Sequence, residues 1–155
     1  LRGTRQPLRQ SVLWRRASTV FELPWRLDAL AELRSRLSAA CQDFPPEARD
    51  ALTLAAAEAI TNIVRHEQQP FADSRICCRI SGTIKTVVVE LIYAGNPYAP
   101  PADIGTNFSA DSTGGFGLYL IRNSVDEVDY ASVIAGINCV RLVKHAAPPA
   151  TAEHA

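Results

Sequence analysis

The chain has 155 residues, of which 47% are hydrophobic and 21% are charged, so it can bury the core of one compact domain. These values exclude an intrinsically disordered chain. Sixteen acidic residues balance sixteen basic ones, so the chain lacks the basic excess that is typical of proteins that bind nucleic acid directly.

The two ends of the chain differ from its middle. Residues 1–17 lack hydrophobic periodicity and hold five arginines before the first acidic residue, Glu22, which predicts a basic, flexible arm. Residues 146–155 are rich in Ala, Pro and Thr and are predicted to be disordered. The folded domain is therefore expected over residues 18–145.

Cysteine usage and hydropathy narrow the class of protein further. The four cysteines form no CxxC pair and have no histidine at metal-ligand spacing, so we expect free thiols in a reducing compartment and no zinc site. No apolar run approaches the roughly 20 residues that span a bilayer, and no secretory leader opens the sequence. A cytoplasmic protein without a membrane partner is expected.

The first half of the domain is predicted to form a strand and two helices. A strand is expected over Thr19–Leu23, which alternates and ends before a proline. Leucines at helical spacing predict a helix over Asp28–Phe44 with Asp28 as its N-cap. A second helix is expected from Pro46 to about Gln68, since proline favours the first helical turn.

The pattern then changes to period two. Strands are predicted over Arg75–Ser81 and Thr86–Ile92, and the second is so apolar that we expect it to be buried on both faces. Tyr93–Thr113 is a polar loop of roughly 20 residues, longer than a compact domain normally keeps without a function.

The last part of the domain is predicted to hold a helix and a hairpin. The helix is expected over Leu118–Val125, directly after a glycine-rich segment. Val128–Ile134 and Ile137–Val143 are expected to pair across a turn at Ala135 and Gly136.

Three polar side chains share one face of the second helix. Glu58, Asn62 and His66 are spaced four residues apart, which keeps them on one stripe. A carboxylate and an amide one turn apart suit Mg²⁺, which takes oxygen ligands. The carboxylate could instead act as a general base, and a solvated helix face explains the stripe equally well.

Gly114, Gly115, Phe116 and Gly117 lie between the long loop and the third helix. Glycines let backbone N–H groups approach an anion, and a helix N-terminus adds favourable partial charge. The segment therefore predicts a phosphate site, with a tight loop-to-helix turn as the alternative.

Taken in order, these motifs resemble the GHKL ATPase superfamily, and most closely the anti-sigma-factor serine-protein kinases of bacterial partner-switch systems. Glu58–His66 resembles the N box, Ala94–Pro100 the first glycine box and Gly114–Leu118 the second. Asn138–Leu142 resembles the final strand. The likeness covers about residues 18–145.

The resemblance implies a Bergerat ATP-binding fold, which is an α/β (α+β) two-layer sandwich. Its sheet would be mixed but largely antiparallel, with three helices on one face. ATP and Mg²⁺ would lie between the helices and a mobile lid over about Ala99–Thr113. The implied activity is phosphorylation of a serine on a small anti-sigma antagonist, while the free kinase sequesters a sigma factor. A homodimer is also implied.

The same resemblance implies roles for individual residues. Glu58 would act as the catalytic base, and Asn62 would hold Mg²⁺. Arg65 and His66 would lie near the phosphates. The other positions of the nucleotide site would be Tyr93, Gly95, Gly114, Gly115, Phe116, Gly117 and Leu118.

One position departs from the family pattern. The family recognises adenine with an Asp two residues before the first-box glycine, and here that position is Tyr93. Glu90 cannot replace the Asp simply, because three residues away in a strand it points to the other face. The phenol of Tyr93 could bond to a ring nitrogen of adenine, or its ring could fill the adenine slot.

Three hypotheses therefore stay open. The first is a working ATP-dependent serine kinase with unusual adenine recognition. The second is an ATP-independent partner-switch or anti-sigma binding module. The third, a detached histidine-kinase-type catalytic domain, is disfavoured because no helix with a phospho-acceptor histidine precedes the motifs in this sequence.

Overall fold

The computed structural model describes residues 16–100 and 115–147. In this part of the chain the elements are β1 Arg16–Pro24, α1 Ala29–Ala40, α2 Pro46–His66, β2 Arg75–Gly82, β3 Thr86–Ala94, α3 Gly115–Ser124, β4 Glu127–Ile134 and β5 Ile137–His145. None of the described helices is long and apolar enough to cross a membrane.

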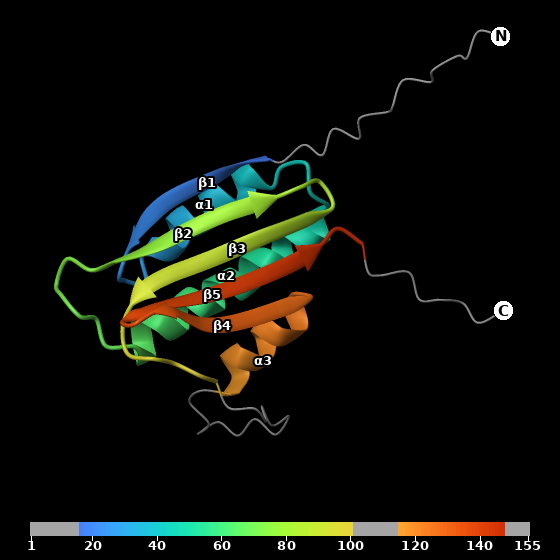
Figure 1. Ribbon diagram of the computed structural model, residues 1–155. Helices are drawn as coiled ribbons and strands as arrows, with labels where there is room; N and C mark the ends of the chain where they lie inside the picture. Colours follow the sequence, from blue (N-terminus) through green and yellow to red (C-terminus); the bar gives the residue numbers. More distant parts are fainter. Residues whose placement is uncertain (1–15, 101–114, 148–155) are drawn as a thin grey trace, which may run out of the picture.

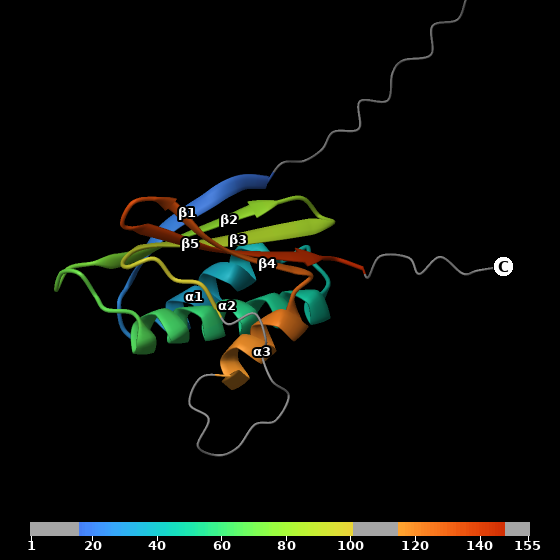
Figure 2. The ribbon, with the colours of Figure 1, turned by 60° about the horizontal axis from the view of Figure 1, so that its bottom comes forward.

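The strands form one sheet in the order β1-β2-β3-β5-β4, and each pairing among them is antiparallel (Figure 1). All three helices cover the same face of this sheet (Figure 2). The predicted two-layer α+β sandwich with three helices on one face is therefore confirmed. The predicted mixture of parallel and antiparallel strands is not found among the described strands.

The core lies between the sheet and α2, and β3 shows why only one face of the sheet contributes to it. Val87, Val89 and Leu91 are buried, whereas the residues between them are only half-buried. Glu90 is one of these, and it accepts a 2.6 Å hydrogen bond from Arg79 Nε on the outer face. The prediction that this strand is buried on both faces is therefore wrong, because none of the described helices covers the outer face.

The helix boundaries shift by a few residues from their predicted positions. The first helix ends at Ala40, and a turn follows in which the Phe44 amide donates to Cys41 O. Asp28 occupies the N-cap position, but its carboxylate accepts from Arg26 Nε at 3.1 Å and makes no side-chain cap bond. The second helix ends at His66, two residues before the predicted Gln68.

The second half of the domain follows the predicted order. β4 and β5 form the predicted hairpin, and Gly136 takes the positive φ of 81° that its turn requires. β3 continues to Ala94, so the long loop begins after that residue rather than at Tyr93. Most of the loop, with the predicted lid residues 101–113 and Gly114, lies outside the described residues.

The predicted terminal segments also lie mostly outside the described residues. Of the predicted arm, residues 1–15 are not described, while Arg16 and Ala17 already belong to β1. Of the predicted tail, residues 148–155 are not described.

Candidate functional site

Two of the three predicted side chains on α2 converge on the first turn of α3. A Cβ atom placed on Gly117 would lie 3.1 Å from Glu58 Oε2 and 3.3 Å from Asn62 Oδ1. Both oxygens thus approach the α3 backbone at one point, and any side chain there would require them to shift. Glu58 and Asn62 are half-buried, so this meeting point lies at the edge of the core.

The arrangement brings a carboxylate to the positive end of a helix. Gly117 is the third residue of α3, and the first helical turn carries unpaired N–H groups and positive partial charge. No acidic residue of α3 itself lies in that turn, so Glu58 supplies the compensating charge. A carboxylate and an amide oxygen are also the donors that Mg²⁺ prefers, so these residues fit a magnesium and phosphate site.

The third member of the predicted stripe lies apart. His66 is the last residue of α2, and it is exposed, as is Arg65 before it. Cationic side chains are favoured at a helix C-terminus, which explains their place without a ligand. His66 acts on its neighbour Glu67, whose pKa it lowers against the larger, opposite effect of burial.

The second glycine box forms the first turn of α3 rather than a loop that precedes it. Gly115 is the first residue of the helix, Phe116 is 53% exposed, and Leu118 is buried in the domain. The predicted helix therefore begins three residues earlier than expected. Gly114 lies outside the described residues, so its predicted contact with phosphate remains a prediction.

The other half of the candidate site is built around Tyr93. This side chain lies on the helix-facing side of β3 near the end of the strand, and it is only 3% exposed. Its ring meets Trp25 edge-on, with the ring centroids 5.9 Å apart and the planes at 78°. Burial raises the pKa of the Tyr93 hydroxyl, so the phenol stays neutral at physiological pH.

Asn138 on β5 is the neighbour of Tyr93 across the sheet and is held in place by hydrogen bonds. It is paired with Tyr93 in the sheet and is 4% exposed. Its Nδ2 donates to Asn96 O at 2.7 Å, and its Oδ1 accepts from Ser132 Oγ at 3.1 Å. These bonds tie β5 to the segment after β3, so Tyr93 lies in a rigid part of the domain.

Gly95 and two more tyrosines complete the surroundings. A Cβ on Gly95 would lie 3.7 Å from Tyr93 Cε2 and 3.8 Å from Glu67 Oε2, at ordinary packing distance. Tyr98 and Tyr130 meet edge-on with centroids 5.8 Å apart. The Tyr130 hydroxyl is buried with no hydrogen-bond partner among the described residues, and burial raises its pKa to about 12.

The base half of the site therefore does not fit the family's mode of adenine recognition. A neutral phenol stands where a carboxylate would accept a hydrogen bond from the adenine amine. Glu90 lies on the outer face with Arg79, as its sequence position predicts, so it cannot replace that carboxylate. Sequence reasoning missed the contribution of Trp25 and Asn138, although a lone amide in the apolar strand β5 is a signal for the second.

Open space near these residues is found on the helix face and at the end of the sheet. A groove of about 280 Å³ between α1 and α2 is lined by Leu54, Arg34 and Glu58 among others. A groove of about 320 Å³ beside Gly95 is lined by Phe71 and by other residues of that end, and Tyr93 is not one of them.

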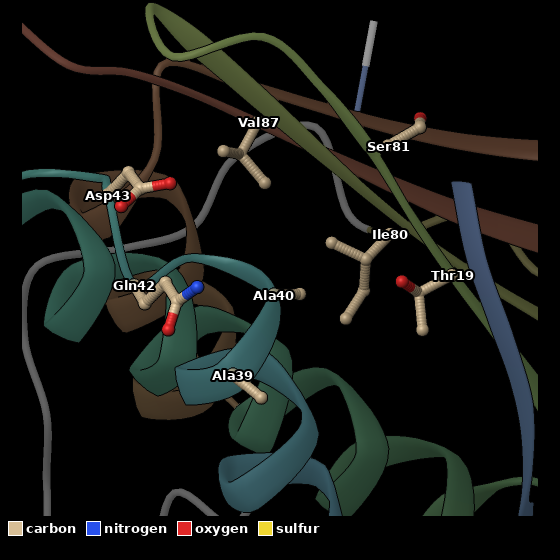
Figure 3. Close-up of a pocket in the computed structure, with 8 residues that line it drawn as sticks. All are labelled: Thr19, Ala39, Ala40, Gln42, Asp43, Ile80, Ser81 and Val87. Atoms are coloured by element: carbon tan, nitrogen blue, oxygen red, sulfur yellow. The ribbon is translucent and has the colours of Figure 1, made fainter. Parts of the chain in front are cut away.

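Figure 3 shows a separate hollow of about 260 Å³ at the opposite end of the sheet. Its lining combines Ile80 and Val87 with small residues from the end of α1, and it contains none of the predicted site residues. We therefore do not treat it as part of the candidate site.

Comparison with known proteins agrees with this architecture. Residues 23–144 match the family model of the histidine kinase-like ATPase domain. No curated protein sequence matches the chain. Among solved structures, the chain is similar to the crystal structure of the RsbU and RsbW domains of Rv1364c from Mycobacterium tuberculosis, with a TM-score of 0.61 and 14% identity.

That alignment covers 83% of this chain and 32% of the other, so the chain spans about a third of the length of its structural neighbour. At this identity the neighbour shows the fold alone. The family match runs from the end of β1 almost to the end of β5 and includes every described helix. The chain belongs to the family of histidine kinase-like ATPase domains, within the GHKL superfamily.

Proposed function

We propose that this chain is a partner-switch regulator of the anti-sigma type, which acts by binding a sigma factor or a small antagonist protein. The observation that carries the proposal is the burial of Tyr93 at the position of adenine recognition, which favours a domain that works through protein contacts. The resemblance of its motifs to anti-sigma serine kinases and its likeness to a structure that contains an RsbW domain support this class of regulator.

The groove between α1 and α2 supports a role in protein binding. Leu54 is 42% exposed there, beside the charged side chains of Arg34 and Asp50. An exposed leucine flanked by both signs of charge suits a protein partner, since such interfaces combine an apolar centre with a polar rim.

An ATP-dependent serine kinase is the second candidate, and the contact of Glu58 and Asn62 with Gly117 favours it. In that function Asn62 would hold Mg²⁺, and Glu58, which lines the open groove, would accept the proton of the partner's serine. Arg65 and His66 would lie near the phosphates. ATP would supply the phosphoryl group, and the added charge on the partner would break one partnership in favour of another.

Binding measurements with purified proteins test the first candidate. The sigma factors of the source organism and its small antagonist proteins would each be titrated against the chain without nucleotide. We expect one of them to bind with a dissociation constant in the micromolar range or tighter, and Leu54→Asp to weaken that binding at least about tenfold.

Ile84→Asp is the matched control, because Ile84 is an equally apolar side chain, 57% exposed, in the turn between β2 and β3. It should leave binding unchanged. If no sigma factor or antagonist binds, the regulator proposal is wrong. Transfer of labelled phosphate from ATP to an antagonist, abolished by Glu58→Gln and by Asn62→Ala, would establish the kinase instead.

A further inference from the structure

The deepest part of the base half is already filled by the chain itself. The ring of Tyr93 contacts Trp25, which is 7% exposed, and Tyr93 is paired across the sheet with Asn138, which is 4% exposed. Trp25 belongs to the hydrophobic core, and Asn138 is a buried polar residue. A planar base could enter this space only if the tyrosine ring left it.

The ring has little freedom to leave. Asn138 is held by hydrogen bonds from Ser132 and to Asn96, which fix β4, β5 and the segment after β3 around it. Gly95 lies two residues further along the chain, and a Cβ atom placed on it would already meet Tyr93 Cε2 at 3.7 Å, so the backbone passes close to the ring. Any outward swing of Tyr93 would leave a void beside Trp25, and voids in close-packed interiors are destabilising.

The chemistry of the position also disfavours a base. The carboxylate of the family accepts a hydrogen bond from an exocyclic amine, whereas a buried phenol carries no charge to offer. Glu67 is the carboxylate that acts electrostatically on Tyr93; its Oε2 would lie 3.8 Å from a Cβ atom on Gly95, and burial raises its pKa. It is not aligned with the strand position that the family uses, since it follows the last turn of α2.

We propose that Tyr93 is a built-in plug of the base half, so that a nucleobase contributes nothing to ligand binding by this domain. The inference deepens the proposed function, because a regulator with this plug exchanges partners without sensing adenine nucleotides. The proposal concerns only the base half. It makes no statement about binding of phosphate or Mg²⁺ at Glu58, Asn62 and Gly117.

The test compares ligands that differ only in the base. The wild-type chain would be titrated by calorimetry with ATP, GTP and inorganic tripolyphosphate, each with Mg²⁺. We expect the three dissociation constants to agree within about threefold, or no binding of any of them, since either result means that the base adds nothing. ATP binding at least about tenfold tighter than tripolyphosphate would overturn the proposal.

Substitution of Tyr93 tests whether removal of the ring allows the base to contribute to binding. Tyr93→Asp removes the ring and restores a carboxylate, so we expect it to bind Mg-ATP at least about tenfold tighter than Mg-tripolyphosphate. Tyr93→Phe keeps the ring and is the matched control, with the wild-type pattern expected. A folded Tyr93→Asp protein that still shows no preference for ATP would contradict the proposal.

Tyr93→Ala covers the case in which the buried aspartate prevents folding. Here free adenine should raise the melting temperature, because it refills the space, while it leaves Tyr93→Phe unchanged. An equal effect of adenine on both variants would count against the plug. Binding of the protein partner is measured separately without nucleotide. Failure of the proposal for Tyr93 can therefore be distinguished from failure of the proposed regulatory function.

Discussion

The two halves of the candidate site have opposite designs on one frame. At α2 and α3 a glycine replaces a side chain, so that Glu58 and Asn62 can approach the backbone of Gly117. At the end of β3 an aromatic ring replaces a small acidic side chain, and Tyr93 is only 3% exposed. The first half leaves space at Gly117, whereas in the second half the ring of Tyr93 occupies the space.

This difference teaches that a family fold can retain part of a ligand site for structural reasons. The carboxylate of Glu58 compensates the positive end of α3 whether or not a ligand is present. This interaction stabilises the contact between α2 and α3 independently of any nucleotide. The base half has no such second role, so its carboxylate can be exchanged for core packing.

The largest effect should come from emptying the base half. Tyr93→Ala should lower the free energy of unfolding by about 3–5 kcal/mol, because it removes a buried ring and leaves a cavity. Phe71→Ala is the control, since that ring is 73% exposed and should change stability by less than about 0.5 kcal/mol. Urea denaturation measures both. A loss below about 1 kcal/mol for Tyr93→Ala would mean that the ring is not packed in the core.

The next effect should come from the amide that borders the ring. Asn138→Ala removes both hydrogen bonds of a buried side chain and should cost about 1–3 kcal/mol of stability. Asn123→Ala removes an exposed amide of α3 and should have an effect of about 0.5 kcal/mol or less. Equal losses in the two variants, again by urea denaturation, would show that Asn138 does not lock the base half.

The contact of Glu58 and Asn62 with Gly117 is tested by whether Gly117→Ala destabilises or stabilises the protein. Gly117→Ala should gain up to about 1 kcal/mol of helix propensity but lose about 1–3 kcal/mol to the contact with Glu58 and Asn62. In a Glu58→Ala, Asn62→Ala background only the gain should remain, so the same substitution should stabilise. A double-mutant cycle measures this coupling, which we expect to be at least about 1 kcal/mol. Additive effects would mean that Gly117 does not contact Glu58 and Asn62 closely enough to affect stability.

The smallest effect concerns Glu67 at the border of the base half. Its pKa is raised in the folded state, mainly by burial, so its favourable contribution is complete below its ordinary value of 4.5 and is lost as pH rises through the folded pKa. Glu67→Gln should therefore gain stability relative to the wild type between about pH 4 and pH 7. Solvent screening keeps the difference below about 1 kcal/mol. A relative loss over that range would contradict this assignment.

Much of the architecture is predictable from local pattern. Period-two alternation and the hairpin turn at Gly136 place the last strands, and Pro46 places the start of α2. The spacing of Glu58 and Asn62 puts them on one helix face, as the structure confirms. That β3 is buried on one face only was not predictable, because an apolar strand sequence does not show how many layers of helix cover the sheet.

The sequence by itself determined the family motifs, the order of the elements and the presence of a tyrosine where the family has an aspartate. It left open whether that ring enters the slot or swings away from it. Only the tertiary structure decided this, because Trp25, which follows β1, and Asn138 on β5 are distant in sequence and meet Tyr93 only when the sheet is assembled. The tertiary structure also decided the position of His66. It is the last residue of α2, four residues after Asn62, and it is exposed to solvent, so it does not join Glu58 and Asn62 at Gly117.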